Sequence, residues 1–209
     1  TTGAQNTAVG HECLTSSTTG INNSALGHDS LKANTTGDYN TAIGSFALTS
    51  NTTADNNVAM GFSALEACTT GGANVAIGRY ALKASTTAVA NTAIGYNALE
   101  ALTTGTQNTS VGAYALDAIT TGTTCTAVGY QALTANTASN NAAFGSTALA
   151  TNTTGAQNCA FGHAALVSTT TGSDNSVFGY AAMYTNSTGG QNTAIGREAL
   201  HLSTTASYN

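Results

Sequence analysis

A glycine recurs at a fixed interval along this chain of 209 residues. The series begins with Gly10 and Gly27 and keeps the same 17-residue spacing to Gly196, except that the interval between Gly129 and Gly145 is shorter by one. A period of this size is typical of solenoids, in which each repeat is one structural unit that stacks on the next. We therefore predict one continuous array over residues 1–209, with repeats that begin at residues 1, 18, 35, 52, 69, 86, 103, 120, 136, 153, 170, 187 and 204.

Each repeat follows the consensus TTGxxNTAIGxxALxAx, whose successive positions we call slots 1 to 17. Slot 6 is almost always Asn, slot 9 is always a large apolar residue, and slot 14 is Leu except at Met183. The charged residues fall only in slots 4–5, 11–12 and 15. Because charged side chains are almost never buried without a partner, we expect these slots to face water and the others to be buried or stacked.

The apolar spacing of slots 9, 13 and 16 also suits a short amphipathic helix, for example over Gly95–Leu102. One short helix per repeat would give an α/β repeat, which is the alternative fold. A helix is about 10 Å across, whereas paired strands lie about 4.8 Å apart, so strands let turns of this size stack straight. We predict an all-β fold: a β-solenoid, or β-roll, of about twelve rungs.

Two strands per turn are expected, over slots 5–9 and 12–16. In this prediction slots 7, 9 and 14 face inward, slots 6, 8 and 10 face outward, and the slot 10 glycine turns the chain with a positive φ. Phe144, Phe161 and Phe178 fill slot 9 in consecutive repeats and should stack as one buried column.

Slot 8 is Ala in nearly every repeat, although the prediction places it on the outside. A strand that faces water would carry mixed polar residues there, so a column of small residues indicates close approach by another surface. The simplest partner is a second copy of the chain. The predicted interface between copies contains Ala42, Ala59, Ala76 and Ala93.

The TTGxxNTAIGxxAL repeats resemble those of phage tail-fibre proteins and large bacterial surface proteins, over the whole chain. The segments NTAVGHECL (Asn6–Leu14) and NSALGHDSL (Asn23–Leu31) also resemble the head repeats of trimeric autotransporter adhesins, whose unit is shorter. These resemblances imply a stalk or an attachment device, extracellular or on a virion surface. The adhesin resemblance further implies a β-roll that assembles as a homotrimeric rod.

Aromatic residues gather at slots 11 and 12, which the charge pattern places at the surface. Exposed rings along one edge suit stacking against sugars, because their faces are apolar. Simple covering of the edge of a β-rod is the other explanation. The candidate glycan contacts are Tyr80, Tyr96, Tyr114, Tyr130 and Tyr180.

Other residue columns have plainer explanations. His11 and His28 share slot 11 in adjacent repeats beside Glu12 and Asp29, but the slot also holds other residue types, so no metal site is predicted. The four cysteines fall in four different slots and in repeats that are not neighbours, which puts intrachain disulfides out of reach. The slot 6 Asn column predicts a stacked amide ladder, and the Thr column at slot 2 raises ice binding as an alternative.

The composition narrows the function further. Only 6% of the residues are charged, the net charge is −5 and there is no Pro. Nucleic-acid binding needs a clustered basic stripe, and a membrane span needs about 20 apolar residues in a row; neither is present in the sequence. A repeated surface offers no unique pocket, so we expect no enzyme and no cofactor. The predicted function is a structural shaft segment of an extracellular fibre, made of copies of this chain, with an adhesin or ice-binding repeat that contacts glycan or ice as the alternative.

Overall fold

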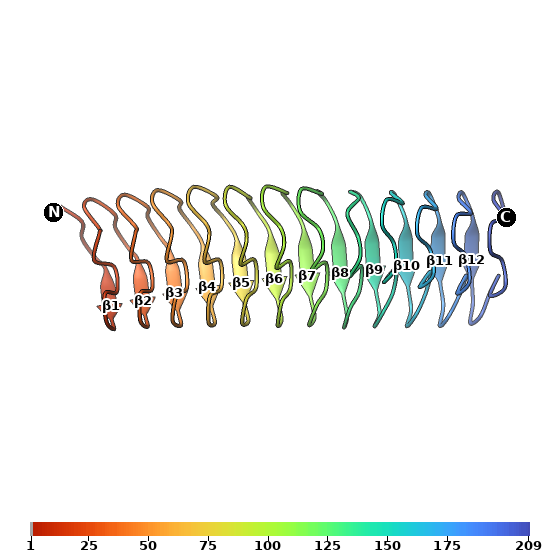
Figure 1. Cartoon of the computed structure of the whole chain (residues 1–209), viewed down its shortest axis with the longest axis horizontal. Coiled ribbons are helices and arrows are strands. Elements are labelled where there is room, and N and C mark those ends of the chain that lie inside the picture. Colours follow the sequence, from red (N-terminus) through yellow and green to blue (C-terminus); the bar gives the residue numbers. More distant parts are fainter. Residues whose placement is uncertain (1) are drawn as a thin grey trace.

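The chain forms a rod of stacked turns, and its N- and C-termini lie at opposite ends of the rod (Figure 1). This computed structural model describes residues 2–209. Each turn contributes one three-residue strand, and the twelve strands pair in chain order as one parallel sheet. The strands are β1 (Thr7–Val9), β2 (Ser24–Leu26), β3 (Thr41–Ile43), β4 (Val58–Met60), β5 (Val75–Ile77), β6 (Thr92–Ile94), β7 (Thr109–Val111), β8 (Thr126–Val128), β9 (Ala142–Phe144), β10 (Cys159–Phe161), β11 (Ser176–Phe178) and β12 (Thr193–Ile195).

The prediction of an all-β solenoid is confirmed, and the alternative with one helix per repeat is wrong. Residues 2–209 contain no helix, and hence none that is long and apolar enough to cross a membrane. Parallel strands usually need a long crossover between them. Here the rest of the same turn, slots 10 to 17 and 1 to 6, is that crossover.

The register between neighbouring strands is the repeat period itself. Thr41 pairs with Val58, which fills the same slot one repeat further on, whereas Thr126 pairs with Ala142 across the short repeat. In that repeat Thr137 donates to the carbonyl of Thr153 from both its backbone N–H and its hydroxyl. Slot 1 threonines such as Thr35 make the same two bonds to the next turn, so Thr137 occupies slot 1 and this repeat begins at residue 137, not at residue 136 as predicted. The missing residue is therefore the slot 2 residue, which is exposed in the other turns, and its loss leaves the core intact.

The predicted orientation of slots 6 to 9 is wrong. The slot 8 side chain of nearly every strand is buried, while slots 7 and 9 are partly or fully exposed. Ala42, Ala59, Ala76 and Ala93 each have 0% exposure within the single chain. Their methyl groups are covered by their own turn and its neighbours, so these four side chains cannot line a contact with another chain.

The narrow width of the turn explains why slot 8 holds Ala. At Ser110, the one slot 8 hydroxyl, Oγ donates to the carbonyl of Ala115 in slot 13 of the same turn, over 2.8 Å. The slot 8 side chain therefore lies within hydrogen-bond distance of the backbone on the opposite side of the same turn. The space between them holds little more than a methyl group. The larger Val177 occurs in the turn where slot 14 is Met183 instead of Leu. An unbranched Met side chain adapts to an irregular space more readily than Leu, which compensates for the extra bulk.

The core is a set of one-residue columns that run along the rod. Slot 14 was predicted to face inward, and from the second turn to the eleventh this is confirmed. The buried members of this column are Leu31, Leu48, Leu65, Leu82, Leu99, Leu116, Leu133, Leu149, Leu166 and Met183, each with 0% exposure. Ala in slot 13 packs in the same cluster. Slot 17, which the sequence analysis did not place in the core, is also buried, for example at Leu102 and Ile119.

Slots 12 to 16 do not form the predicted second strand. In the third turn Phe46 and Leu48 have φ of 62° and 50°, whereas the residues between and beside them have negative φ. Phe46 donates to the carbonyl of His28 in the preceding turn, and Leu48 donates to that of Ala64 in the following one. The segment is thus hydrogen-bonded to both neighbours without being a strand.

The slot 10 glycines do adopt the positive φ that was predicted, and they also lie where no side chain fits. Gly95 has φ of +137°, and a Cβ there would lie 2.6 Å from the carbonyl oxygen of Gly112 in the next turn. Both the backbone conformation and the spacing between turns therefore require glycine at this slot.

The predicted amide ladder at slot 6 is confirmed, although its side chains are buried and not outward-facing. The Asn91 carboxamide accepts the backbone N–H of Asn108, 2.9 Å away, and donates to the carbonyl of Gly105 at the same distance. Each amide thus satisfies backbone groups of the next turn that would otherwise be buried without a partner. Cys125 interrupts the column, and its thiol donates to Ala138 instead.

The Phe column was predicted to be stacked and buried, and only the stacking is confirmed. Phe144, Phe161 and Phe178 do stack, with ring centroids 4.4 and 4.9 Å apart. They lie on the outside of the sheet, however, and Phe178 is 43% exposed. We call the surface made by slots 7 and 9 of β1–β12 the outer sheet face.

A pair of adjacent lysine substitutions tests this orientation. Ala93→Lys would force a charged, bulky side chain into a closed turn, and we expect a loss of at least about 3 kcal/mol of unfolding free energy. Ile94→Lys places the same side chain on the outer sheet face, where Ile94 is 37% exposed in the single chain, and should cost less than about 1 kcal/mol in samples dilute enough to contain single chains. Urea denaturation measures both, and similar costs for the two variants would contradict the orientation.

Candidate functional site: an aromatic edge and an adjoining groove

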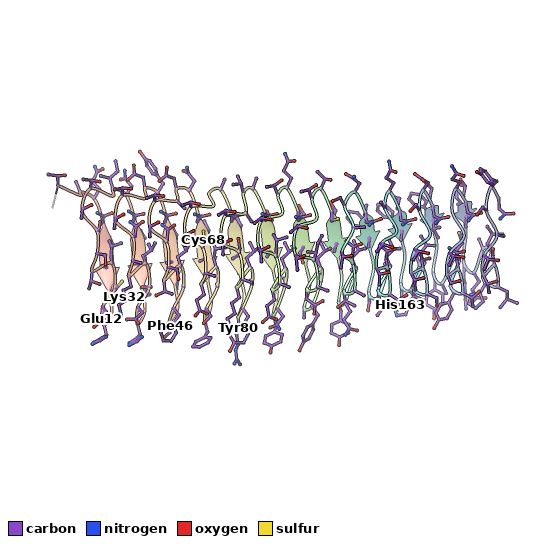
Figure 2. The ribbon with its side chains drawn as sticks, turned by 45° about the horizontal axis from the view of Figure 1, so that its top comes forward. Glu12, Lys32, Phe46, Cys68, Tyr80 and His163 are labelled. Atoms are coloured by element: carbon purple, nitrogen blue, oxygen red, sulfur yellow. The ribbon has the colours of Figure 1, made fainter. Side chains whose placement is uncertain are left out.

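One edge of the rod carries a nearly continuous row of aromatic rings, most of which meet their neighbours edge to face. The rings come alternately from slots 11 and 12 in much of the row, just after the slot 10 glycine turns the chain outward. Neighbouring centroids lie 5.1 to 6.4 Å apart. We call this row the aromatic edge; its members are His11, His28, Phe46, Phe62, Tyr80, Tyr96, Tyr114 and Tyr130. In Figure 2 the side chains of Phe46 and Tyr80 extend away from the ribbon along this edge.

The structure brings four of the five candidate tyrosines into this row and separates the fifth. Tyr80, Tyr96, Tyr114 and Tyr130 are consecutive members. The next turn has Ser146 and Thr147 at slots 11 and 12, so the row ends there. Beyond this break Tyr180 stacks only on His163, with centroids 5.4 Å apart. Four phenol rings in series, and not five, therefore form the candidate surface.

Cations contact the rings near the middle of the aromatic edge. The Arg79 guanidinium lies 4.6 Å from the Tyr80 ring centroid, and its Nη2 donates to the Tyr80 hydroxyl over 3.0 Å. The Lys83 ammonium lies over the same ring, also at 4.6 Å. The pKa of the Tyr114 phenol is raised above its ordinary value, mainly because burial removes water from it. The Tyr114 phenol therefore remains neutral at physiological pH and presents an apolar ring face.

A groove of about 490 Å³ runs beside the aromatic edge. Its floor is made of small residues in slot 16, and its rim of charged residues in slot 15. The lining residues are Ser50, Glu66, Ala67, Lys83, Ala84, Glu100, Ala101 and Asp117. The groove adjoins the aromatic edge because Lys83, on its rim, contacts Tyr80, and because Asn97, next to Tyr96 in the chain, donates to Glu100.

The groove presents more carboxylates than cations. Glu66, Glu100 and Asp117 face a single ammonium, that of Lys83. Within the part of the chain that the structure describes, Lys83 forms no ion pair with them. Asp117 accepts a hydrogen bond from the Thr134 hydroxyl over 2.7 Å. Carboxylates that lack a cationic partner can accept hydrogen bonds from hydroxyl groups of a ligand.

The remaining candidate residues are placed as follows. The four cysteines are unpaired, as predicted. Burial raises the pKa of the Cys68 thiol to about 11, so little reactive thiolate forms at neutral pH. The slot 2 threonines form one exposed row, while slot 1 hydroxyls such as that of Thr35 donate to the backbone of the next turn. A second free row of threonines beside slot 2 is therefore missing from residues 2–209.

The sequence analysis did not identify the groove or the inward position of slot 17. The alanines of slot 16 gave a usable signal, since small residues beside charged ones allow a hollow. No family model matches the sequence, and comparison with curated proteins and with solved structures gives no significant match. The chain is a β-solenoid repeat protein. Successive turns lie side by side in chain order, and hydrogen bonds join the same slots of neighbouring turns.

Proposed function

We propose that this chain is a structural shaft segment of an extracellular fibre, of the kind found in phage tail fibres or bacterial surface filaments. The observation that carries the proposal is that nearly every turn makes the same hydrogen bonds to the next turn, from Thr2 to Asn209. Each added turn lengthens such a stack by about 4.8 Å and repeats the same kinds of contact with its neighbour. A chain built this way is suited to spanning a distance.

The location is tested directly by immunogold electron microscopy of intact cells or virions of the source, with antibodies raised against this chain. The proposal expects gold particles along protruding filaments. Label that appears only after the cells are opened would contradict an extracellular fibre. Preimmune serum on the same specimens is the control.

The outer sheet face supports a second part of the proposal, that copies of the chain associate side by side. It carries a large apolar residue in each of the twelve strands and no charged residue at slots 7 and 9. Val9, Leu26 and Met60 are 56%, 49% and 38% exposed. A continuous apolar stripe of this length is unusual on the surface of a soluble monomer.

A second copy is the partner that fits this stripe best. Two rods of this sequence have the same spacing between strands, so their side-chain columns can stay in register along the whole length. The absence of charge at slots 7 and 9 also removes electrostatic repulsion between identical faces. The resemblance to trimeric adhesins suggests three copies. The interface proposed from the structure is thus the outer sheet face and not the buried Ala column.

Light scattering of a double variant tests the association. Ile43→Lys with Ile94→Lys puts two charges on the outer sheet face, and we expect the mass in solution to fall to that of one chain while the β spectrum is kept. Thr49→Lys with Thr134→Lys, at slot 15, is the matched control and should keep the parent mass. A monomeric parent, or a double variant that assembles normally, would contradict the proposed interface.

Glycan binding at the aromatic edge is a second candidate function. The specific observation in its favour is a series of four phenol rings, of which Tyr80 and Tyr96 adjoin a groove whose carboxylates form no ion pair within residues 2–209. Rings can stack on sugar faces while carboxylates accept hydrogen bonds from sugar hydroxyls. Ice binding has less support, because only one row of exposed threonine hydroxyls runs along slots 1 and 2.

A pair of tyrosine substitutions tests this candidate. Binding to a panel of bacterial surface polysaccharides should weaken by about tenfold or more in Tyr96→Ser with Tyr114→Ser, since each ring contributes roughly 1 kcal/mol of stacking. Tyr39→Ser is the control, because Tyr39 is 56% exposed and lies in slot 5, away from the aromatic edge. No binding by the parent chain, or equal losses in both variants, would count against a glycan site.

A further inference from the structure

The aromatic edge begins with two histidines instead of phenyl or phenol rings. His11 and His28 occupy slot 11 in adjacent turns, and their rings stack with centroids 5.1 Å apart and an interplanar angle of 6°. Both side chains are exposed. Two imidazole rings, parallel to each other and one turn apart, therefore lie at the surface.

A carboxylate with a free oxygen lies beside this pair. Asp29 Oδ1 is 3.7 Å from His28 Nδ1, and it is buried without a hydrogen-bond partner. The Asp29 side chain is only 14% exposed. Its other oxygen, Oδ2, pairs with Lys32 Nζ over 3.4 Å. A buried carboxylate oxygen without a partner is costly, and a bound cation would satisfy it.

The charges around the histidines also favour a cation. Glu12 and Asp29 provide two carboxylates, and Lys32 bridges them with a single ammonium. The cluster of two carboxylates and one ammonium therefore keeps one excess negative charge beside the two imidazole rings. Lys32 contacts Glu12 and the Oδ2 side of Asp29, which leaves Oδ1 free on the side of His28.

We propose that His11, His28 and Asp29 bind one divalent transition-metal ion of the zinc class. One candidate ligand atom from each of the three residues lies within 4.8 Å of the others. Tetrahedral zinc with bonds of about 2.0–2.1 Å places its ligand atoms about 3.4 Å apart. The two exposed imidazoles need to approach by about 1–2 Å, which side-chain rotation allows. Two imidazole ligands suit zinc and copper better than magnesium or calcium, and zinc also accepts a carboxylate oxygen as a ligand.

The bound ion would join the first two turns of the described rod. The first strand, β1, has all three of its residues exposed and pairs with one neighbour, β2. Terminal repeats of a stack are the least stable because they have one interface instead of two. A metal held by His11 from one turn and by His28 and Asp29 from the next would link this turn to the second.

Calorimetric titration of the metal-free chain with zinc chloride tests the proposal. We expect one site per chain in the parent, with binding at least about tenfold weaker in His28→Ala and in Asp29→Asn, since even second-shell changes cost that much at metal sites. His163→Ala is the matched control, because His163 also occupies slot 11 and stacks on Tyr180, but its adjacent turns have no second slot 11 histidine and no slot 12 carboxylate. That variant should bind zinc like the parent.

Hydrogen exchange separates a metal site from loss of structure. Without zinc, His28→Ala and Asp29→Asn should keep the parent's circular dichroism, and zinc should slow exchange at the Asp29 amide, which donates to the carbonyl of His11, in the parent only. No zinc binding by the parent, or binding that both variants retain, would overturn the proposal. In that case the two histidines are only the first members of the aromatic edge.

Discussion

Hydrogen bonds between the same slots of successive turns are the interaction on which the rest of this structure depends. They fix the spacing of the turns at the distance between paired strands, about 4.8 Å. At that spacing every side chain lies over the side chain of the same slot in the next turn. Slot 10 must then be glycine, because a Cβ on Gly95 would meet the carbonyl of Gly112. Slot 6 must offer both a donor and an acceptor, which Asn91 does.

The same constraint makes the core thin and the backbone unusual. Each turn encloses little more than Leu in slot 14 and Ala in slots 8 and 13. To satisfy its polar groups with both neighbours, the backbone adopts left-handed conformations at slots 5, 12 and 14, as in Tyr39, Phe46 and Leu48. Each such residue other than glycine costs roughly 1–2 kcal/mol. The ladder of backbone and amide hydrogen bonds along the rod must offset this cost.

The 17-residue period and the slot 10 glycines were enough to predict a solenoid without helices. They could not settle which face of the strand is inside, because strand residues alternate with a period of two and a shift of one residue reverses both faces. The residue sizes held the missing signal. Slot 9 ranges from Val9 to Phe161 and faces outward, whereas slot 8 stays small because Ala93 and its equivalents fill a closed turn. The conformation of slots 12 to 16 was not predictable, since Leu48 carries no sequence signal for positive φ.

The aromatic edge was predictable because charge and rings share slots 11 and 12. The groove was missed, although small residues in slot 16, such as Ala84, beside charged residues in slot 15 were a usable signal for it. The unpaired oxygen of Asp29 depends on which side of the carboxylate Lys32 contacts.

X-ray diffraction from an aligned film of the purified rods tests the central claim most directly. Turns that are hydrogen-bonded slot to slot should give a meridional reflection at about 4.8 Å, the spacing of paired strands along the rod axis. A meridional repeat well above about 5 Å, or a pattern dominated by the helical pitch of about 5.4 Å, would contradict the stacked turns on which every other conclusion depends.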